Sequence, residues 1–457
     1  MAGLIAVYNY NGNKSSDTTI FYLIRGMRML QHRGKAYWKL MIGDNVIENQ
    51  GSIPSDDVLL ASIKKKKLSG FCAVGYLSKR SPLFPSMNLF DISIDGFLVD
   101  TEKLYLHPHI GSAKKLDPLY QIFYIFMKLI TEKKNSEQAA EFIDRHLRGN
   151  IIIKKKNEIF IFRNSTGFKP LIMATDDHIV VISSENSLRI SFPHLNYVNI
   201  NPGQLIKLSL KNHVQDLVTL KDHKILLDPF EFIRESHVTS MFNNKSIYSI
   251  RKNIGKVQAD RLPLEMDLDS IYAEPDYTRP MALGMGLSLQ NKFSKFEISE
   301  GVIKDRYDDS DHMIDFSEQV SKNKLLTTGK SLKFIIENLT KNRKIATIQG
   351  TIQTGSTARE TIYYLKKNGV KQVNVIVCYV PTIDGRQVGL YTHNRDFLAN
   401  KYVGKMSNLD QLNSFVSREI GCEKIFYNSP SLLAKGIGIP ESNLWFPEWI
   451  RFLEYEK

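Results

Sequence analysis

One short polar segment in the second half of the chain has the residue types that hold a phosphate group. A glycine lets the backbone turn closely around an anion, and neighbouring hydroxyls donate hydrogen bonds to it. If a helix follows, its free backbone N–H groups and positive dipole end point at the same place. The residues concerned are Thr351, Thr354, Gly355, Ser356 and Thr357. They form a candidate phosphate-binding loop, although such residues are also common N-terminal helix caps.

The segments on either side of this loop predict one parallel βαβ unit. Lys344–Ile348 is a short apolar strand, Ser356–Lys367 has a helical pattern ended by Asn368 and Gly369, and Val373–Val380 is a second strand. Parallel strands joined by a helix form a right-handed crossover, which leaves the loop at the carboxyl edge of the sheet. Ligands bind at this edge in such folds.

The first half of the chain predicts a sheet with inserted helices. Apolar residues recur at helical spacing in Asp17–Leu30, and Pro118–Ile130 is typical of a buried helix. The expected strands are Met1–Tyr8, Phe71–Leu77, Ile151–Ile153, Ile159–Phe162, His178–Ser184 and Gln204–Leu210. The character of the sequence changes around Leu220–Phe232. We therefore expect two domains, residues 1–225 of α+β class and residues 226–457 of α/β class.

The charge balance invites a nucleic-acid function, but the residue pattern argues against it. Lys and Arg number 61 against 48 Asp and Glu, which gives a formal net charge of +13 in a chain of 457 residues. The lysine runs Lys64–Lys67 and Lys154–Lys156 are expected in solvated loops, without the aromatic interleaving or zinc-finger spacing of nucleic-acid binders. We expect no nucleic-acid partner. The basic balance also suits an anionic small ligand or an acidic partner chain.

Cysteine and apolar patterns exclude further classes of protein. Cys72, Cys378 and Cys422 lie far apart, so they build neither a disulfide framework nor an iron–sulfur cluster, and we find no set of residues with metal-ligand spacing. The longest apolar run, Leu119–Ile130, is too short to cross a bilayer, and the first residues lack a charged leader. We expect no membrane association and a cytoplasmic location.

Several segments together resemble the glutamine phosphoribosylpyrophosphate amidotransferases, which catalyse the first committed step of purine synthesis. Leu30-Gln31-His32-Arg33-Gly34 is similar to the early signature of that family. Similar segments follow in the family's order over nearly the whole chain. They are Phe162-Arg163-Asn164, Gly167–Leu171, Ser183-Ser184-Glu185, Asn201-Pro202-Gly203-Gln204, Pro275-Asp276, Ala282-Leu283-Gly284, Lys304–Tyr307 and Ile345–Arg359.

The resemblance implies an N-terminal-nucleophile (class II glutamine amidotransferase) αββα sandwich followed by a type I phosphoribosyltransferase domain with a parallel sheet. In that family the first domain frees ammonia from glutamine with a cysteine thiol. The second domain uses the ammonia to displace pyrophosphate from a diphosphate sugar, which brings its own magnesium. The family also implies self-association.

The chain departs from the family at the positions of the glutaminase site. Ala2 stands where the family has its cysteine, and a methyl group is no nucleophile. The family's arginine that clasps the glutamine carboxylate aligns within Gly75–Lys79, most simply at Ser78. Asp95-Gly96 aligns with the oxyanion-hole asparagine–glycine, and a carboxylate there would repel a developing oxyanion. Asp117 aligns with the group that binds the substrate amine, or it caps a helix. We expect Arg33 to be structural.

The transferase site departs more selectively. Gln349-Gly350 replaces two adjacent acidic residues that hold the ribose hydroxyls in the family. Each such charged hydrogen bond contributes about 1.5–3 kcal/mol, and only Gln349 can replace one of them with a neutral bond. After Arg306-Tyr307 the family's flexible catalytic loop becomes the acidic run Asp308–Asp311. The phosphate-binding loop, in contrast, keeps its donors.

We therefore predict a pseudoenzyme, a paralogue that retains the scaffold and the phosphate-binding loop without either catalytic constellation. It would be a regulatory or assembly partner of an active amidotransferase, or a sensor of phosphorylated ribose or a purine nucleotide. One alternative is an amidophosphoribosyltransferase that uses free ammonia. Another is a basic adaptor that binds nucleic acid.

Overall fold

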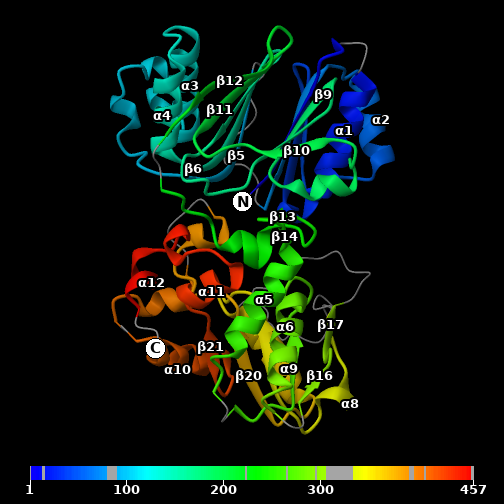
Figure 1. Ribbon diagram of the computed structural model, residues 1–457, viewed down its shortest axis with the longest axis vertical. Helices are drawn as coiled ribbons and strands as arrows, with labels where there is room; N and C mark the ends of the chain where they lie inside the picture. Colours follow the sequence, from blue (N-terminus) through cyan, green and yellow to red (C-terminus); the bar gives the residue numbers. More distant parts are fainter. Residues whose placement is uncertain are drawn as a thin grey trace. The chain divides into compact units, whose positions relative to one another are not determined.

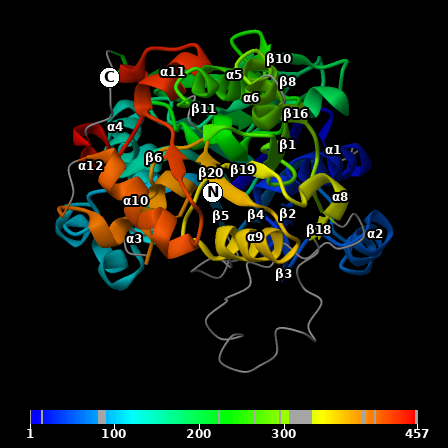
Figure 2. The same cartoon turned by 90° about the horizontal axis from the view of Figure 1, so that it is seen from below.

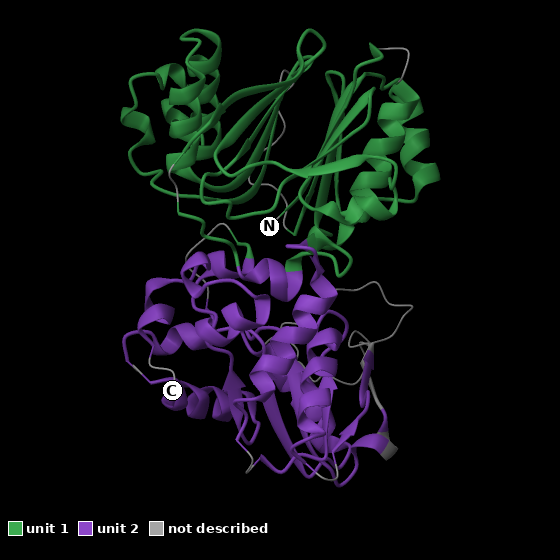
Figure 3. Ribbon diagram, in the orientation of Figure 1, with its two compact units in different colours: residues 1–228, 235–241, 389–391 green, residues 229–234, 242–388, 392–457 purple. Residues whose placement is uncertain are grey.

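The computed structural model describes residues 2–12, 16–79, 90–221, 224–263, 266–293, 296–304, 333–390, 396–405 and 408–453. The chain forms two compact units, coloured separately in Figure 3. Unit 1 comprises residues 1–228, 235–241 and 389–391, and unit 2 comprises residues 229–234, 242–388 and 392–457.

Unit 1 contains two antiparallel sheets with helices on their outer faces (Figure 1). The first sheet has seven strands in the order β10-β8-β9-β1-β4-β2-β3, and the second has five in the order β12-β11-β7-β6-β5. The first is formed by β1 (Ala2–Asn9), β2 (Tyr37–Ile42), β3 (Asn45–Gln50), β4 (Cys72–Ser78), β8 (Ile172–Thr175), β9 (Ile179–Ser183) and β10 (Asn196–Asn199). The second is formed by β5 (Phe90–Leu98), β6 (Leu147–Lys155), β7 (Glu158–Arg163), β11 (Gln204–Ser209) and β12 (His213–Thr219).

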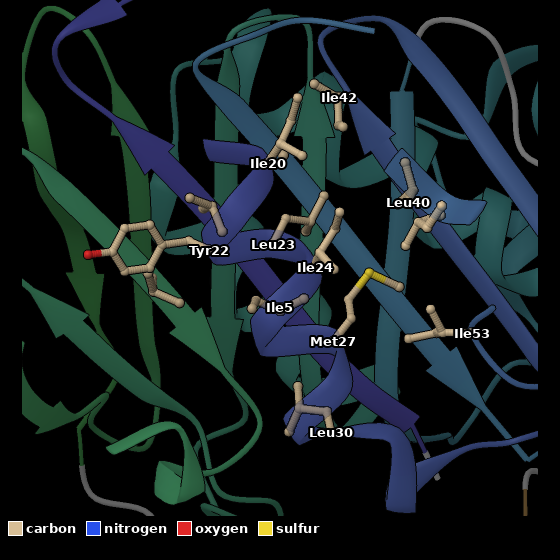
Figure 4. Close-up of a cluster of buried hydrophobic side chains, with 14 of the residues drawn as sticks. Ile5, Ile20, Tyr22, Leu23, Ile24, Met27, Leu30, Leu40, Ile42 and Ile53 are labelled. Atoms are coloured by element: carbon tan, nitrogen blue, oxygen red, sulfur yellow. The ribbon is translucent and has the colours of Figure 1, made fainter. Parts of the chain in front are cut away.

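Helices cover the outer face of each sheet because their apolar residues recur at helical spacing. In α1 (Ser16–Met29) the buried side chains include Ile20, Leu23 and Met27, which pack with Ile5 of β1 (Figure 4). On the same sheet lies α2 (Asp56–Lys65), and α3 (Pro118–Thr131) and α4 (Ser136–His146) cover the second sheet. The layers are therefore helix, sheet, sheet, helix.

The space between the two sheets is the core that positions the start of the chain. Side chains alternate along a strand, so Leu4 and Ala6 of β1 face the second sheet while Ile5 and Val7 face α1. Every residue of β1 is buried for this reason. Ala2 lies in the same inter-sheet cluster.

Unit 2 is built around a five-stranded parallel sheet in the order β16-β15-β19-β20-β21. Its strands are β15 (Ser270–Ala273), β16 (Glu297–Ile298), β19 (Lys344–Gln349), β20 (Gln372–Val377) and β21 (Ile425–Tyr427). Its longer helices are α5 (Ile247–Ala259), α6 (Arg279–Leu289), α9 (Ser356–Lys367), α10 (Leu409–Ile420) and α11 (Pro430–Ile437). Figure 2 shows α9, which connects β19 to β20. The shorter elements are β13 (Met241–Phe242), β14 (Lys245–Ser246), β17 (Val302–Lys304), β18 (Lys333–Ile335), α8 (Glu337–Thr340) and α12 (Glu448–Phe452).

Helices α5 and α6 cross with their backbones in contact. A Cβ on Gly255 would lie 1.9 Å from the carbonyl oxygen of Met281, and one on Gly284 would lie 1.8 Å from that of Lys252. Only glycine allows this approach.

The predicted βαβ unit is confirmed, because β19 and β20 pair in parallel and α9 has the predicted bounds. The second strand ends at Val377, three residues before the predicted end. The expectation that both lysine runs lie in solvated loops was wrong in part. Lys64 and Lys65 are exposed but belong to α2, and Lys154 belongs to β6 and is only 1% exposed. Its ammonium donates to the carbonyl oxygens of Gly43 and Lys156 at 2.5 and 2.6 Å, and these hydrogen bonds replace those that it would make to water.

Within the described ranges, no helix combines the length and the apolar character that a membrane span needs.

Candidate functional site

The first candidate site lies where β1 begins, around the backbone of Ala2. The Ala2 N–H donates to Asp95 Oδ1 at 2.9 Å, and the Ala2 carbonyl accepts from Arg33 Nε at 2.9 Å. Arg33 Nη2 donates to Asp95 Oδ2 at 2.8 Å. The two charged side chains thus bond to each other and to both polar backbone groups of Ala2. Arg33 and Asp95 are fully buried.

Two glycines bring the strands of the second sheet together beside this ion pair. Asp95 and Gly96 of β5 pair with Asn150 and Gly149 of β6. Gly96 and Gly149 have φ values of +143° and +140°, which other residues rarely adopt. A Cβ on Gly96 would also lie 2.0 Å from the carbonyl oxygen of Arg148. The glycine that follows Asp95 is therefore a requirement of the sheet itself.

Glu185 extends the ion pair into a larger buried network. Its Oε1 accepts from His32 Nε2 at 2.5 Å and lies 3.5 Å from Arg33 Nη1. Its Oε2 accepts from the His237 N–H at 2.7 Å and from Ser240 Oγ at 2.5 Å. Burial alone would raise the pKa of Glu185, but the charges and hydrogen bonds of His32, Arg33 and Ser240 lower it to about 2.

Ser78 and Asp117 are also placed by the fold. Ser78 ends β4, is buried, and pairs with Ala2 on one side and Tyr37 on the other. A hydroxyl here brings no positive charge to the site. Asp117 is the N-cap of α3, where Oδ1 accepts the Leu119 N–H at 2.9 Å. Burial raises the pKa of its carboxyl group.

The second candidate site is the loop between β19 and α9 in unit 2. Gly355 immediately precedes α9 with a φ of +79°. Thr354 Oγ1 lies 3.1 Å from Ser356 Oγ, and Thr351 Oγ1 lies 3.0 Å from Thr382 Oγ1. The Thr354 and Ser356 hydroxyls thus lie at the first turn of α9, in the loop that follows β19. Phosphate binding by this loop stays a prediction.

A cationic side chain from α9 contacts the same loop. Arg359, one turn into α9, donates from Nη2 to the Thr354 carbonyl at 3.0 Å. A Cβ on Gly355 would lie 3.1 Å from Arg359 Nη1. The guanidinium therefore adds positive charge beside the helix N-terminus, which favours an anion. Thr357 follows Ser356 in the first turn of α9 and is half-buried.

The end of β19 is occupied by contacts within unit 2. Gln349 is only 4% exposed, and its Nε2 donates to Glu274 Oε2 at 3.1 Å. The neutral bond that the sequence suggested for a ribose hydroxyl is thus made to Glu274. Gly350 lies against the ring of Tyr277.

The structure adds residues that sequence reasoning did not assign. The sequence signals Glu185 only through the family resemblance of Ser183-Ser184-Glu185, and Arg359 only as the last residue of the similar segment Ile345–Arg359. Glu274 and Tyr277 come from the loop after β15, more than seventy positions before their partners. No local spacing signals such contacts, since they depend on the pairing of β15 with β19.

The described residues offer no metal site, and one predicted loop lies outside them. Within the described residues, no group of three or more His, Cys, Asp or Glu side chains could hold a metal ion. Arg306-Tyr307 and the acidic run Asp308–Asp311 lie outside the described residues.

Comparison with known proteins gives distant relatives over nearly the whole chain. No family model matches. The chain is 21% identical to the amidophosphoribosyltransferase of Methanocaldococcus jannaschii over an alignment of 474 positions, which covers 96% of this chain and 94% of that protein. It is 21% identical to the amidophosphoribosyltransferase of Pyrococcus horikoshii over 445 residues, which cover 93% of this chain and 90% of that protein.

Solved structures give the same result for the fold. The B. subtilis glutamine phosphoribosylpyrophosphate amidotransferase, complexed with ADP and GMP, matches with a TM-score of 0.72 and 17% identity, covering 95% of this chain and 92% of that one. A structure described as the allosteric regulatory enzyme of purine biosynthesis matches with a TM-score of 0.73 and 17% identity, covering 97% and 94%. The predicted fold class, a class II glutamine amidotransferase domain followed by a parallel-sheet phosphoribosyltransferase domain, is confirmed.

Removal of the Asp95 carboxylate should destabilise the protein strongly. Asp95→Ala leaves the Arg33 guanidinium with one buried counter-charge fewer, and breaking a buried pair in this way costs about 3–5 kcal/mol. Urea unfolding of the full chain measures the change. Asp177→Ala, in an exposed turn, is the control and should change stability by less than about 0.5 kcal/mol. Equal effects of the two substitutions would show that the buried pair is not important for stability.

The Glu185 network predicts a defined loss of stability in acid. The pKa of Glu185 falls from 4.5 to about 2 on folding, so its stabilising effect is complete above pH 4.5 and is lost as the pH falls from 4.5 toward 2. Glu185→Gln should therefore be less stable than wild type at neutral pH, and the difference should shrink across that acidic range. Urea midpoints measured at a series of pH values test this, with the exposed Glu102→Gln as control. A constant difference at all pH values would contradict it.

Proposed function

Because the chain is a distant homologue of the amidophosphoribosyltransferases, we propose that it is a non-catalytic paralogue of these enzymes. It binds a phosphorylated ribose or a purine nucleotide through the loop at Gly355. It acts as a regulatory or assembly partner of an active amidotransferase in purine biosynthesis, and associates with further copies of itself. The proposal is carried by Ala2, which the resemblance aligns with the cysteine nucleophile of the family.

The surroundings of Ala2 support the loss of glutamine hydrolysis. Without a thiol or hydroxyl at this position no covalent intermediate forms, and removal of such a nucleophile lowers turnover by roughly a millionfold. Asp95 adds a negative charge at the place of the family's neutral donor. That carboxylate is bonded to Arg33 and to the Ala2 N–H, so it is a fixed part of the core.

The end of β19 supports the loss of sugar transfer. In the family two acidic residues hold the ribose hydroxyls, and here Gln349 donates its amide to Glu274 while Gly350 has no side chain. Two missing charged hydrogen bonds correspond to roughly 3–6 kcal/mol of binding free energy. The site would therefore bind a diphosphate sugar weakly and orient it poorly.

The loop and its cation support retained binding of a phosphate group. Hydroxyls, a glycine with positive φ, a helix N-terminus and Arg359 converge there. The related B. subtilis enzyme is described as complexed with ADP and GMP, which makes purine nucleotides reasonable ligands to test.

The purified protein should neither hydrolyse glutamine nor make phosphoribosylamine. The first assay measures ammonia released from glutamine, and the second measures phosphoribosylamine formed from the diphosphate sugar with ammonium chloride. Wild type should be inactive in both assays. Ala2→Cys should remain inactive with glutamine, because Asp95 and Ser78 still replace the oxyanion and carboxylate donors.

An active amidotransferase serves as the positive control in both assays, and as the test of the partner role. When the wild-type chain is added, it should change the rate of the active enzyme or co-elute with that enzyme in size-exclusion chromatography. Turnover of glutamine by wild type would refute the proposal. Product formed only with ammonium chloride would establish the ammonia-dependent enzyme instead.

Phosphate compounds should raise the melting temperature of the protein, because they bind the folded loop and not the unfolded chain. AMP, GMP and ribose 5-phosphate at millimolar concentration are the probes. Ser356→Ala with Thr357→Val removes two hydroxyl donors and should weaken binding about tenfold or more. The exposed Ser442→Ala is the control and should bind as wild type does. No shift with any of the three compounds would rule out the loop as a binding site.

A further inference from the structure

The ring of Tyr277 fills the space beside Gly350 at the end of β19. A Cβ built on Gly350 would lie 2.2 Å from Tyr277 Cε2 and 2.7 Å from its hydroxyl oxygen. Gly350 is not among the glycines with positive φ, so the space and not the backbone requires glycine here. The two residues meet because β15 and β19 are parallel neighbours, with Ala273 paired to Ile348, and the chain turns at the same edge after each.

Tyr277 also contacts a cationic side chain of unit 2. The guanidinium of Arg234 lies 4.9 Å from the centroid of the Tyr277 ring, within the range of a cation–π interaction. Burial raises the pKa of the Tyr277 hydroxyl, so it keeps its proton at neutral pH. The ring is therefore a neutral, packed part of unit 2.

Gln349, the residue before Gly350, also makes contacts within unit 2. Gln349 is bonded to Glu274, and Thr361 of α9 donates to the same carboxylate oxygen at 3.4 Å. Gln349, Glu274 and Thr361 are all buried. In contrast, Thr354, Ser356 and Thr357 of the adjacent loop are only half-buried. The edge of the sheet thus offers donors for a phosphate, but its strand-end side chains are turned to one another.

We propose that Tyr277 determines the ligand specificity of this loop. By occupying the space of any side chain at position 350, it prevents recognition of sugar hydroxyls, and the site takes phosphate monoesters whatever sugar they carry. This inference rests on the proposed binding of phosphate compounds by the loop. It adds that a ribose and a deoxyribose phosphate bind alike.

A ligand comparison tests the specificity. Wild type is titrated with ribose 5-phosphate, 2-deoxyribose 5-phosphate and inorganic phosphate by calorimetry. The two sugar phosphates should bind with affinities within about twofold of each other, since no charged hydrogen bond depends on the sugar hydroxyl. A preference of about tenfold or more for ribose 5-phosphate would overturn the inference and leave the phosphate loop intact. No binding of any of the three would refute the proposed function and this inference together.

A mutant cycle tests the steric claim without any ligand. Gly350→Asp should lower the melting temperature clearly, because its side chain meets the Tyr277 ring. The same change in a Tyr277→Ser background should lower it much less. Tyr277→Phe keeps the ring and is the control, in which Gly350→Asp should be as damaging as in wild type. Equal losses in the wild-type and Tyr277→Ser backgrounds would overturn the inference even if phosphate binds.

The combined variant gives the final readout. Tyr277→Ser with Gly350→Asp places a carboxylate beside the phosphate loop and leaves space for it. This protein should prefer ribose 5-phosphate to 2-deoxyribose 5-phosphate by about tenfold, the effect of one charged hydrogen bond. If the variant is folded and binds phosphate but shows no preference, Tyr277 is not what prevents hydroxyl recognition.

Discussion

The first unit depends on one buried ion pair. Arg33 and Asp95 lie without solvent at the start of β1, and their charges are tolerated because each finds partners. Asp95 accepts the Ala2 N–H, Arg33 donates to the Ala2 carbonyl, and Glu185 adds a second carboxylate to the arginine. This network joins the two sheets, the turn after α1 that carries His32 and Arg33, and the segment that carries His237 and Ser240. The start of β1 is thereby fixed within the framework of unit 1.

The second unit also has a buried polar network, which lies at the end of β19. Its sheet edge keeps the geometry that holds a phosphate group, since α9 begins behind a glycine at the end of β19. Beside it, Gln349 donates to Glu274, and Gly350 lies against the ring of Tyr277. The proposed anion binding relies on backbone N–H groups, which the fold supplies without particular side chains.

The regular spacing of apolar residues made much of the fold predictable from the sequence. The contacts between distant segments could not be predicted in this way. The pattern of Ile20, Leu23 and Met27 predicts α1, and the βαβ unit around Gly355 follows from short apolar strands and a helix stop. Lys154 was misplaced because a lysine run resembles a solvated turn, while its burial depends on carbonyl groups elsewhere in the fold. The pairings of Gln349 with Glu274 and of Gly350 with Tyr277 depend on which strands are neighbours. That information is not contained in local spacing.

The central place of β1 has a consequence for how the molecule is made. This strand pairs with β4 on one side and with β9 on the other, and β9 ends at Ser183. During synthesis the first residues of the chain must therefore wait until nearly two hundred residues have left the ribosome before their sheet is complete. Such distant pairings slow folding and leave strand edges open meanwhile. We expect nascent chains of this protein to need chaperone protection during that interval.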